Sequence, residues 1–150
     1  MTGLAAAAMA YRDRPWRHLG RGPKHFDCVG LVRQACLDLG LPVVEVPANY
    51  GREPDGIRFY ELLVQQFGEP VLMAPVLPRH IEAGALQVDD VLAMRTTRHP
   101  HHLAIVAPHP DHPLGLIHAC GREGRVVWQG LDRPMLRSIA YVFRGGGAHA

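Results

Sequence analysis

The chain has 150 residues, of which 47% are hydrophobic and 20% are charged, and this is enough for one compact domain with a sizeable core. Sixteen Lys and Arg residues against fourteen Asp and Glu residues leave a formal net charge of only +2, with the basic residues spread along the chain, so the composition gives no support to nucleic-acid binding. Three cysteines cannot all pair within one chain, so at least one free thiol has to be explained.

The first part of the chain favours helices. Residues Gly3–Tyr11 predict a short alanine-rich helix, which lacks the basic region that precedes a secretion signal and is too short to cross a membrane. We therefore expect no signal peptide and no membrane association. Turn-forming residues fill 13–25. A second helix is predicted after Asp27, which can cap its start, and Gly40 followed by Leu-Pro predicts its end.

A third helix is predicted over Gly56–Phe67, with Asp55 as its N-cap, and the intervening Val43–Pro54 predicts a loop or a short strand pairing. From Val71 onward, short apolar runs separated by Pro, Gly, Asp and His are typical of strands. The five predicted strands are DVLAMRT, HLAIVAP, GLIHAC, RVVWQG and IAYVFRG. Helices followed by strands indicate an α+β fold, in which the first helices pack on one side of a five-stranded antiparallel sheet. Residues 1–150 then form a single domain with a loose tail at about 145–150.

Cys28 is the candidate nucleophile. It is expected in the first turn of the second helix, where unpaired N–H groups and the helix dipole stabilise a thiolate and lower a thiol pKa from about 8.5 toward neutrality. Asp27 is expected to cap this helix, and Gly30 removes a side chain where another element could approach closely. Cys36 lies two turns later on the apolar face and is interpreted as a packing residue.

A thiol nucleophile needs a base within hydrogen-bond reach, and His102 is the histidine that a strand positions best. Alternation places His102 and Ala104 on one face, and the small Ala104 is expected to let the Cys28 helix pack close to the imidazole. A turn-rich connection leads to the next strand, so His118 is expected beside His102, where it can orient the base. Cys120 shares the face of His118, and is either a neighbour of the site or a packing residue.

The remaining histidines are interpreted as solvated turn residues, because His99, His101, His109 and His112 lie in or beside loops. Metal binding by the RHPHH segment is an alternative, but the segment has no conventional ligand spacing. The sequence therefore predicts no metal site, and no cofactor is expected.

These residues together resemble the NlpC-type (NlpC/p-sixty) cell-wall peptidases, a papain-like family. The family's D-C-S-G-L-V motif is matched by DCVGLV from Asp27, its H-V-G-I motif by HLAI from His102, and its third polar residue before an alanine by His118–Ala119. PWRHLGR is similar to the family's approach segment, and LQVDDVLAMR is similar to one of its strands. The resemblance covers most of residues 12–143.

The resemblance implies hydrolysis of an amide bond in a peptidoglycan stem peptide, with Cys28 attacking, His102 transferring the proton and His118 holding the imidazole. We assign the oxyanion donor to the Cys28 backbone N–H. Trp16 stands where many relatives have a tyrosine thought to serve the oxyanion site, so it is either an indole donor in the cleft or a packing aromatic beneath it. Asp89 replaces a family glycine with no clear consequence for the chemistry, and Asp90 after it is interpreted as structural.

Within the family, the chain looks most like the peptidases of phage tail tips and gene transfer agents. This implies tail-tip or hub proteins as partners. It also implies synthesis in the bacterial cytoplasm, assembly into a phage-like tail, and action in the periplasm or cell wall of the target cell. Two alternatives remain open. One is a structural tail-hub subunit with a masked or weak active site, and the other is a thiol-dependent amidase or acyltransferase with the same triad.

Overall fold

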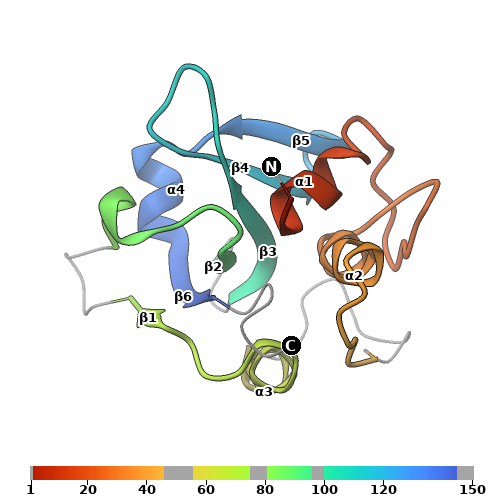
Figure 1. The fold of residues 1–150 in the computed structure, drawn as a ribbon, viewed down its shortest axis with the longest axis horizontal. Helices are drawn as coiled ribbons and strands as arrows, with labels where there is room; N and C mark the ends of the chain where they lie inside the picture. The colour runs from red at the N-terminus through yellow and green to blue at the C-terminus, as the bar shows by residue number, and fades with distance from the viewer. Residues whose placement is uncertain (1, 46–55, 75–80, 96–99, 145–150) are drawn as a thin grey trace.

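The computed structural model describes residues 2–45, 56–74, 81–95 and 100–144. Four α-helices occur in these residues, together with a short 3₁₀ helix (Ala83–Ala85) and six strands (Figure 1). The helices are α1 (Leu4–Met9), α2 (Cys28–Asp38), α3 (Gly56–Phe67) and α4 (Arg133–Ser138). The strands are β1 (Leu72–Met73), β2 (Val91–Arg95), β3 (Pro100–Ala107), β4 (Gly115–Cys120), β5 (Arg125–Gly130) and β6 (Ile139–Phe143). None of the helices in the described part of the chain has the length and apolar character needed to cross a membrane.

The strands form one sheet in the order β1-β6-β2-β3-β4-β5, and every neighbouring pair is antiparallel. The five predicted strands correspond to β2–β6, so the predicted α+β architecture is confirmed. The predicted number of strands is one too low, because β1 adds an edge strand that pairs with β6 at Leu72↔Val142 and Met73↔Tyr141. A strand of two residues is too short to show an alternating pattern, so the sequence carried no signal for it.

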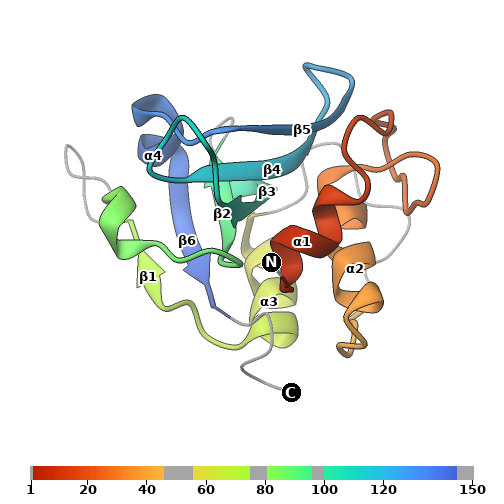
Figure 2. The same cartoon turned by 45° about the horizontal axis from the view of Figure 1, so that its top comes forward.

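The two faces of the sheet carry different helices. Figures 1 and 2 show α1, α2 and α3 on one side and α4 on the other. Leu31 of α2 and Phe59 of α3 belong to a buried cluster with Ile105, whereas Val106 lies in a second cluster against which Met135 of α4 packs. The prediction that the first helices share one side of the sheet is confirmed.

Helix α4 was not predicted, because six residues are too few for a helical period to appear. Its start nevertheless carries a recognisable signal. The Asp132 side chain accepts a hydrogen bond from the Met135 backbone N–H at 2.9 Å, and Pro134 lies in the first turn. This N-cap followed by a proline fixes the position of α4 on the second face of the sheet.

Helix α3 has the predicted bounds, and its aromatic side chains pack on β6. The rings of Tyr60 and Tyr141 are 4.7 Å apart, and those of Phe67 and Phe143 are 6.1 Å apart, as measured between ring centroids. The predicted Asp55 cap, most of the segment Val43–Pro54 and the predicted tail lie outside the described residues.

Residues 13–16 run along the outer edge of β5. Asp13 donates its backbone N–H to the Val126 carbonyl at 3.0 Å, Val126 donates to the Arg14 carbonyl at 2.8 Å, and Trp16 donates to the Gly124 carbonyl at 2.8 Å. These bonds satisfy backbone groups that an open edge strand would leave exposed. They also fix the start of the loop that leads to Cys28.

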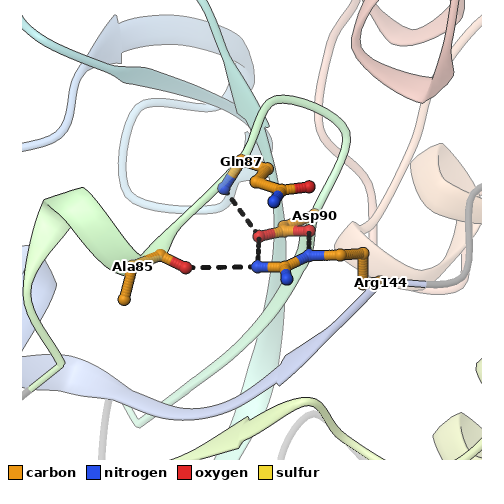
Figure 3. A network of polar contacts seen from close by, with 4 residues as sticks. All are labelled: Ala85, Gln87, Asp90 and Arg144. Carbon is orange, nitrogen blue, oxygen red and sulfur yellow. Dashed lines mark hydrogen bonds and ion pairs between the residues drawn. The ribbon is translucent and has the colours of Figure 1, made fainter.

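An ion pair between a buried carboxylate and a half-buried guanidinium ties the turn before β2 to the end of β6 (Figure 3). Asp90 is only 1% exposed, and its two carboxylate oxygens face Nε and Nη2 of Arg144 at 2.9 and 3.1 Å. The Gln87 backbone N–H donates to Asp90 at 2.8 Å, and Arg144 Nη2 donates to the Ala85 carbonyl at 3.1 Å. Every dashed contact in the figure joins elements of the scaffold, which is the structural role expected for Asp90.

Asp89 has a structural consequence that was not foreseen. Its φ of 79° lies in the left-handed region, which glycine adopts without strain. This agrees with the glycine that the NlpC-type sequences have at the matching position. Its Oδ1 accepts a hydrogen bond from the Ala5 backbone N–H at 2.8 Å. Asp89 therefore caps the start of α1 from a position 84 residues away in the sequence.

Candidate active site

Cys28 begins α2, and its neighbours hold the start of the helix in place. Asp27 is the N-cap residue, and its Oδ1 accepts a hydrogen bond from the Gly30 backbone N–H at 2.7 Å. The same carboxylate is buried and pairs with Arg21, whose Nη1 lies 3.1 Å from Oδ1. The predicted cap is confirmed, and Cys28 occupies the first helical position, where backbone N–H groups are not used by the helix ladder.

The loop before Cys28 connects α2 to the sheet. Its backbone is tied to the segment along β5 by the Phe26 N–H, which donates to the Pro15 carbonyl at 3.0 Å. The loop also contacts the helix, because a Cβ atom on Gly30 would overlap the carbonyl oxygen of Gly20. The close approach expected beside Gly30 is thus made by Gly20. Figures 1 and 2 show this loop passing from α1 past β5 and back to α2.

Strands β3 and β4 separate where the site forms. Their pairing runs from Ala107↔Gly115 to Ile105↔Ile117, whereas β3 remains paired with β2 beyond His102. The Val106 N–H donates to Asp90 on the β2 side, and N–H directions alternate along a strand. The Leu103 N–H therefore points toward β4, at a level where the β3–β4 ladder has ended.

The Cys28 thiol occupies this opening. The backbone N–H groups of Leu103, of Val29 and of Cys28 itself face the Cys28 sulfur and act to lower the pKa of its thiol. Because Leu103 directly follows His102, this contact brings the thiol to the strand position next to the predicted base. The start of α2 and the register of the strands thus bring the Cys28 thiol beside the residue that follows His102, and the contact between thiol and imidazole stays a prediction.

His102 and His118 meet across the separated strands. Nε2 of His102 lies 2.7 Å from Nδ1 of His118, and the two rings are inclined at 79°. His118 is 7% exposed, and burial lowers the pKa of its imidazole, against the opposing effects of the Gln129 hydrogen bond and the Glu123 charge. The predicted proximity of His102 and His118 is confirmed, and a lowered pKa keeps His118 neutral at pH 7.

The protonation state of Cys28 differs from the expectation. Burial raises the pKa of the Cys28 thiol to about 12, and the Asp27 charge acts in the same direction. The three N–H groups lower the pKa by less than burial raises it. Although the residue keeps some accessible surface, atoms pack densely around its sulfur. The expected thiol pKa near neutrality is therefore wrong for the resting site, because desolvation outweighs the helix start.

Ala104 does not have the position that was predicted for it. It lies in the buried cluster on the α4 face, with Val106 and Leu116, whereas α2 packs on the face of Leu103 and Ile105. Ala104 therefore does not provide the clearance between His102 and the Cys28 helix.

Trp16 packs against the turn between β4 and β5. A Cβ atom on Gly121 would lie 3.2 Å from the Trp16 ring, and the indole contacts the buried cluster beneath α1 and α2. This contact favours the packing interpretation, and a role of Trp16 in the cleft stays a prediction, as does the oxyanion role of the Cys28 N–H. Cys120 is half-buried at the end of β4, and Cys36 is buried in α2 as expected.

Two groups at the site were not predicted. Gln129 of β5 contacts His118, since its Oε1 accepts a hydrogen bond from His118 Nε2 at 2.8 Å. A polar residue inside the apolar run RVVWQG was the available signal for it. The Leu103 N–H had no signal, because its direction depends on strand register alone.

No three His, Cys, Asp or Glu side chains come together in a way that could hold a metal ion, as far as the described residues are concerned. The first two residues of RHPHH lie outside the described residues, so the alternative of a metal site there stays open to direct measurement.

No family model matches the chain, and no curated protein matches it. Solved structures do match. NlpC1 from Trichomonas vaginalis has a TM-score of 0.62 at 15% identity, over 95% of this chain and 42% of that one. An NlpC/P60 family protein from Bacillus cereus ATCC 10987 has a TM-score of 0.59 at 18% identity, over 96% of this chain and 39% of that one. The peptidoglycan hydrolase RipB from Mycobacterium tuberculosis has a TM-score of 0.55 at 16% identity, over 94% of this chain and 62% of that one.

The chain spans about two fifths of the length of the first two of these proteins. Identities of this size show a common fold, and the activity has to be argued from the site itself. Over nearly its whole length, the chain adopts the α+β fold of the NlpC/P60 structures.

Proposed function

We propose that this chain is a member of the NlpC/P60 family and a cysteine peptidase that hydrolyses an amide bond in peptidoglycan stem peptides. The observations that carry the proposal are the Leu103 N–H that faces the Cys28 thiol, and the preceding residue His102, whose Nε2 lies 2.7 Å from Nδ1 of His118. A nucleophile, a base and a group that orients the base are the three parts that acyl transfer requires.

In the proposed mechanism, the Cys28 sulfur attacks the carbonyl carbon while His102 takes the thiol proton. The His118 contact uses Nε2 of His102, so this transfer uses Nδ1. The Cys28 N–H stabilises the oxyanion, and His102 then protonates the leaving amine as the C–N bond breaks. Water, deprotonated by His102, hydrolyses the thioester and restores the thiol. Because the raised pKa keeps the thiol neutral at rest, proton removal accompanies attack and does not precede it.

The charge near the site supports an acidic substrate. Residues 12–24 contain four arginines and Lys24, the chain's only lysine, against one acidic residue, Asp13. Arg14, Arg17 and Lys24 are exposed, and the loop that carries them leads directly into the start of α2. Peptidoglycan stem peptides carry free carboxylates, which these cations can attract.

By the sequence resemblance, we also propose that the protein acts as part of a phage tail tip or gene transfer agent, with hub proteins as partners. It would be made in the bacterial cytoplasm and act in the periplasm or cell wall of the target cell. Mass spectrometry of purified phage or gene-transfer-agent particles tests the proposed location separately, because a tail-associated enzyme must be present in washed particles.

The activity is tested by digesting purified sacculi with the wild type and with Cys28→Ala, and by identifying the released muropeptides by mass spectrometry. We expect stem-peptide cleavage products from the wild type and a loss of at least about 1000-fold in Cys28→Ala, because no other group replaces the nucleophile. Cys36→Ala is the matched control, since Cys36 is a buried thiol in the same helix. Products that appear equally with Cys28→Ala would contradict the proposal. Intact sacculi with both proteins would favour the structural tail-hub alternative.

A further inference from the structure

Gln129 lies behind the two histidines and is held at both ends of its amide. Its Oε1 is 2.8 Å from His118 Nε2, and its Nε2 is 3.8 Å from the Met135 sulfur on α4. Strand β5 brings it there, since Leu116 pairs with Gln129 while His118 pairs with Val127. The side chain thus links α4, on one face of the sheet, to the histidine pair.

We propose that Gln129 is a positioning residue whose carbonyl oxygen fixes the tautomers of His118 and His102, so that His102 presents a lone pair at Nδ1 to the Cys28 thiol. This inference rests on the proposed function. The Met135 sulfur is a weak acceptor, so it favours the amide orientation that directs the NH2 group toward α4 and the oxygen toward His118.

The consequence passes along the chain of hydrogen bonds. An amide oxygen can only accept, so the proton of neutral His118 resides on Nε2 and its Nδ1 carries a lone pair. That lone pair accepts from His102 Nε2–H at 2.7 Å. A neutral His102 protonated at Nε2 carries its basic lone pair on Nδ1, which is the state that a base requires.

Reversing the first bond would reverse the others. If a donor faced His118 Nε2, the His118 proton would move to Nδ1 and donate to His102 Nε2. His102 would then carry its proton on Nδ1 and could not accept another from the thiol. Fixing the wrong tautomer of a catalytic histidine is known to cost large factors in rate with the geometry intact.

Three substitutions separate these cases. Gln129→Glu keeps an acceptor, Gln129→Met removes it at similar volume, and Gln129→Lys replaces it by a donor. The exposed Gln65→Met is the control for the loss of a glutamine away from the site. The main readout is the ¹⁵N NMR spectrum of the histidine side chains, assigned by through-bond correlation, because it reports which ring nitrogen carries the proton without any substrate.

In the wild type and in Gln129→Glu we expect His118 Nε2 to be protonated and His102 Nδ1 to be unprotonated. Gln129→Met is expected to give a mixture of tautomers, and Gln129→Lys is expected to reverse them. The value of kcat should fall about 10- to 100-fold in Gln129→Met and stay unchanged in Gln65→Met. An unprotonated His118 Nε2 in the wild type, or unchanged tautomers in Gln129→Met, would overturn the proposal. If the tautomers follow Gln129 while the wild type leaves sacculi intact, the relay stands and the proposed function fails.

Discussion

Two buried polar networks tie strands of this sheet together, and they are built from different chemistry. The network around Asp90 joins β2 and β6 through an ion pair between a carboxylate and a guanidinium (Figure 3). The network around His118 joins β3, β4 and β5 through two imidazoles and an amide. The first network is an ion pair, and the second contains two imidazole rings, each of which can hold its proton on either nitrogen.

The difference separates scaffold from site. In the Asp90 network both carboxylate oxygens and the guanidinium are paired, and the hydrogen bond to Arg144 raises the pKa of that guanidinium further. The Asp90 network therefore offers a proton no second position to occupy. In the histidine chain each ring can hold its proton on either nitrogen, and only the neighbours decide which. The first network is therefore expected to contribute mainly to stability, and the second mainly to rate.

Arg144→Met tests the scaffold side of this comparison and is expected to have the largest effect on stability. It leaves the Asp90 carboxylate, 1% exposed, with the Gln87 N–H as its remaining contact among those described above. Removing one partner of a buried pair costs about 3 kcal/mol, and urea unfolding monitored by tryptophan fluorescence measures it. The double variant with Asp90→Ala should recover part of the loss. If Arg144→Met is as stable as the wild type, the network is not a structural element.

The Cys28 thiol provides the next test, because a charged carboxylate lies near it and the thiol itself must lose a proton. With a pKa raised to about 12, Cys28 should react slowly with iodoacetamide near neutral pH, and its rate should increase about tenfold per pH unit toward that pKa. Asp27→Asn keeps a capping oxygen and removes the charge that adds to the effect of burial on the pKa, so the thiolate fraction and the alkylation rate at a given pH should increase, by up to about tenfold.

Cys36 is an internal control for this measurement. Burial raises the pKa of its thiol to about 11, and its rate should not respond to Asp27→Asn. Peptide mass spectrometry distinguishes the thiols. If Cys28 is alkylated faster than a free model thiol at about pH 6, a thiolate paired with an imidazolium already exists in the resting site, and proton transfer precedes attack.

The sequence predicted the parts of this molecule that depend on local pattern. Helical spacing placed α2 and α3, and alternation placed β2–β6, because each of these elements is long enough to show its period. The grouping of His102 with His118 also followed from two adjacent strands joined by a turn-rich connection. Segments of two and six residues, β1 and α4, have too few residues for a period to appear.

The errors concern quantities that packing decides. Alternation correctly put Ala104 and Val106 on one face, but it could not tell that α2 would cover the opposite face and reach the site from the edge of β3. The helix start suggested a lowered pKa for Cys28, whereas the density of atoms around the sulfur depends on the whole fold. The contact of Gln129 with His118 depends on the register of β4 and β5, which no local pattern shows.

The smallest effect on stability is expected at Asp89, which is the immediate neighbour of Asp90 and also a carboxylate. Its side chain accepts a hydrogen bond from the Ala5 N–H at 2.8 Å, and its φ of 79° is unfavourable for a side chain. Asp89→Ala keeps the strain and loses the bond, so we expect a loss of about 1 kcal/mol in the free energy of unfolding. Asp89→Gly loses the bond but relieves the strain, so its stability should lie closer to the wild type. Asp89→Asn retains an acceptor and should be nearly neutral.

If Asp89→Ala were as destabilising as Arg144→Met, then the start of α1 would depend on this carboxylate as strongly as the sheet depends on Asp90, and the contrast between fixed buried charge and single hydrogen bonds would fail.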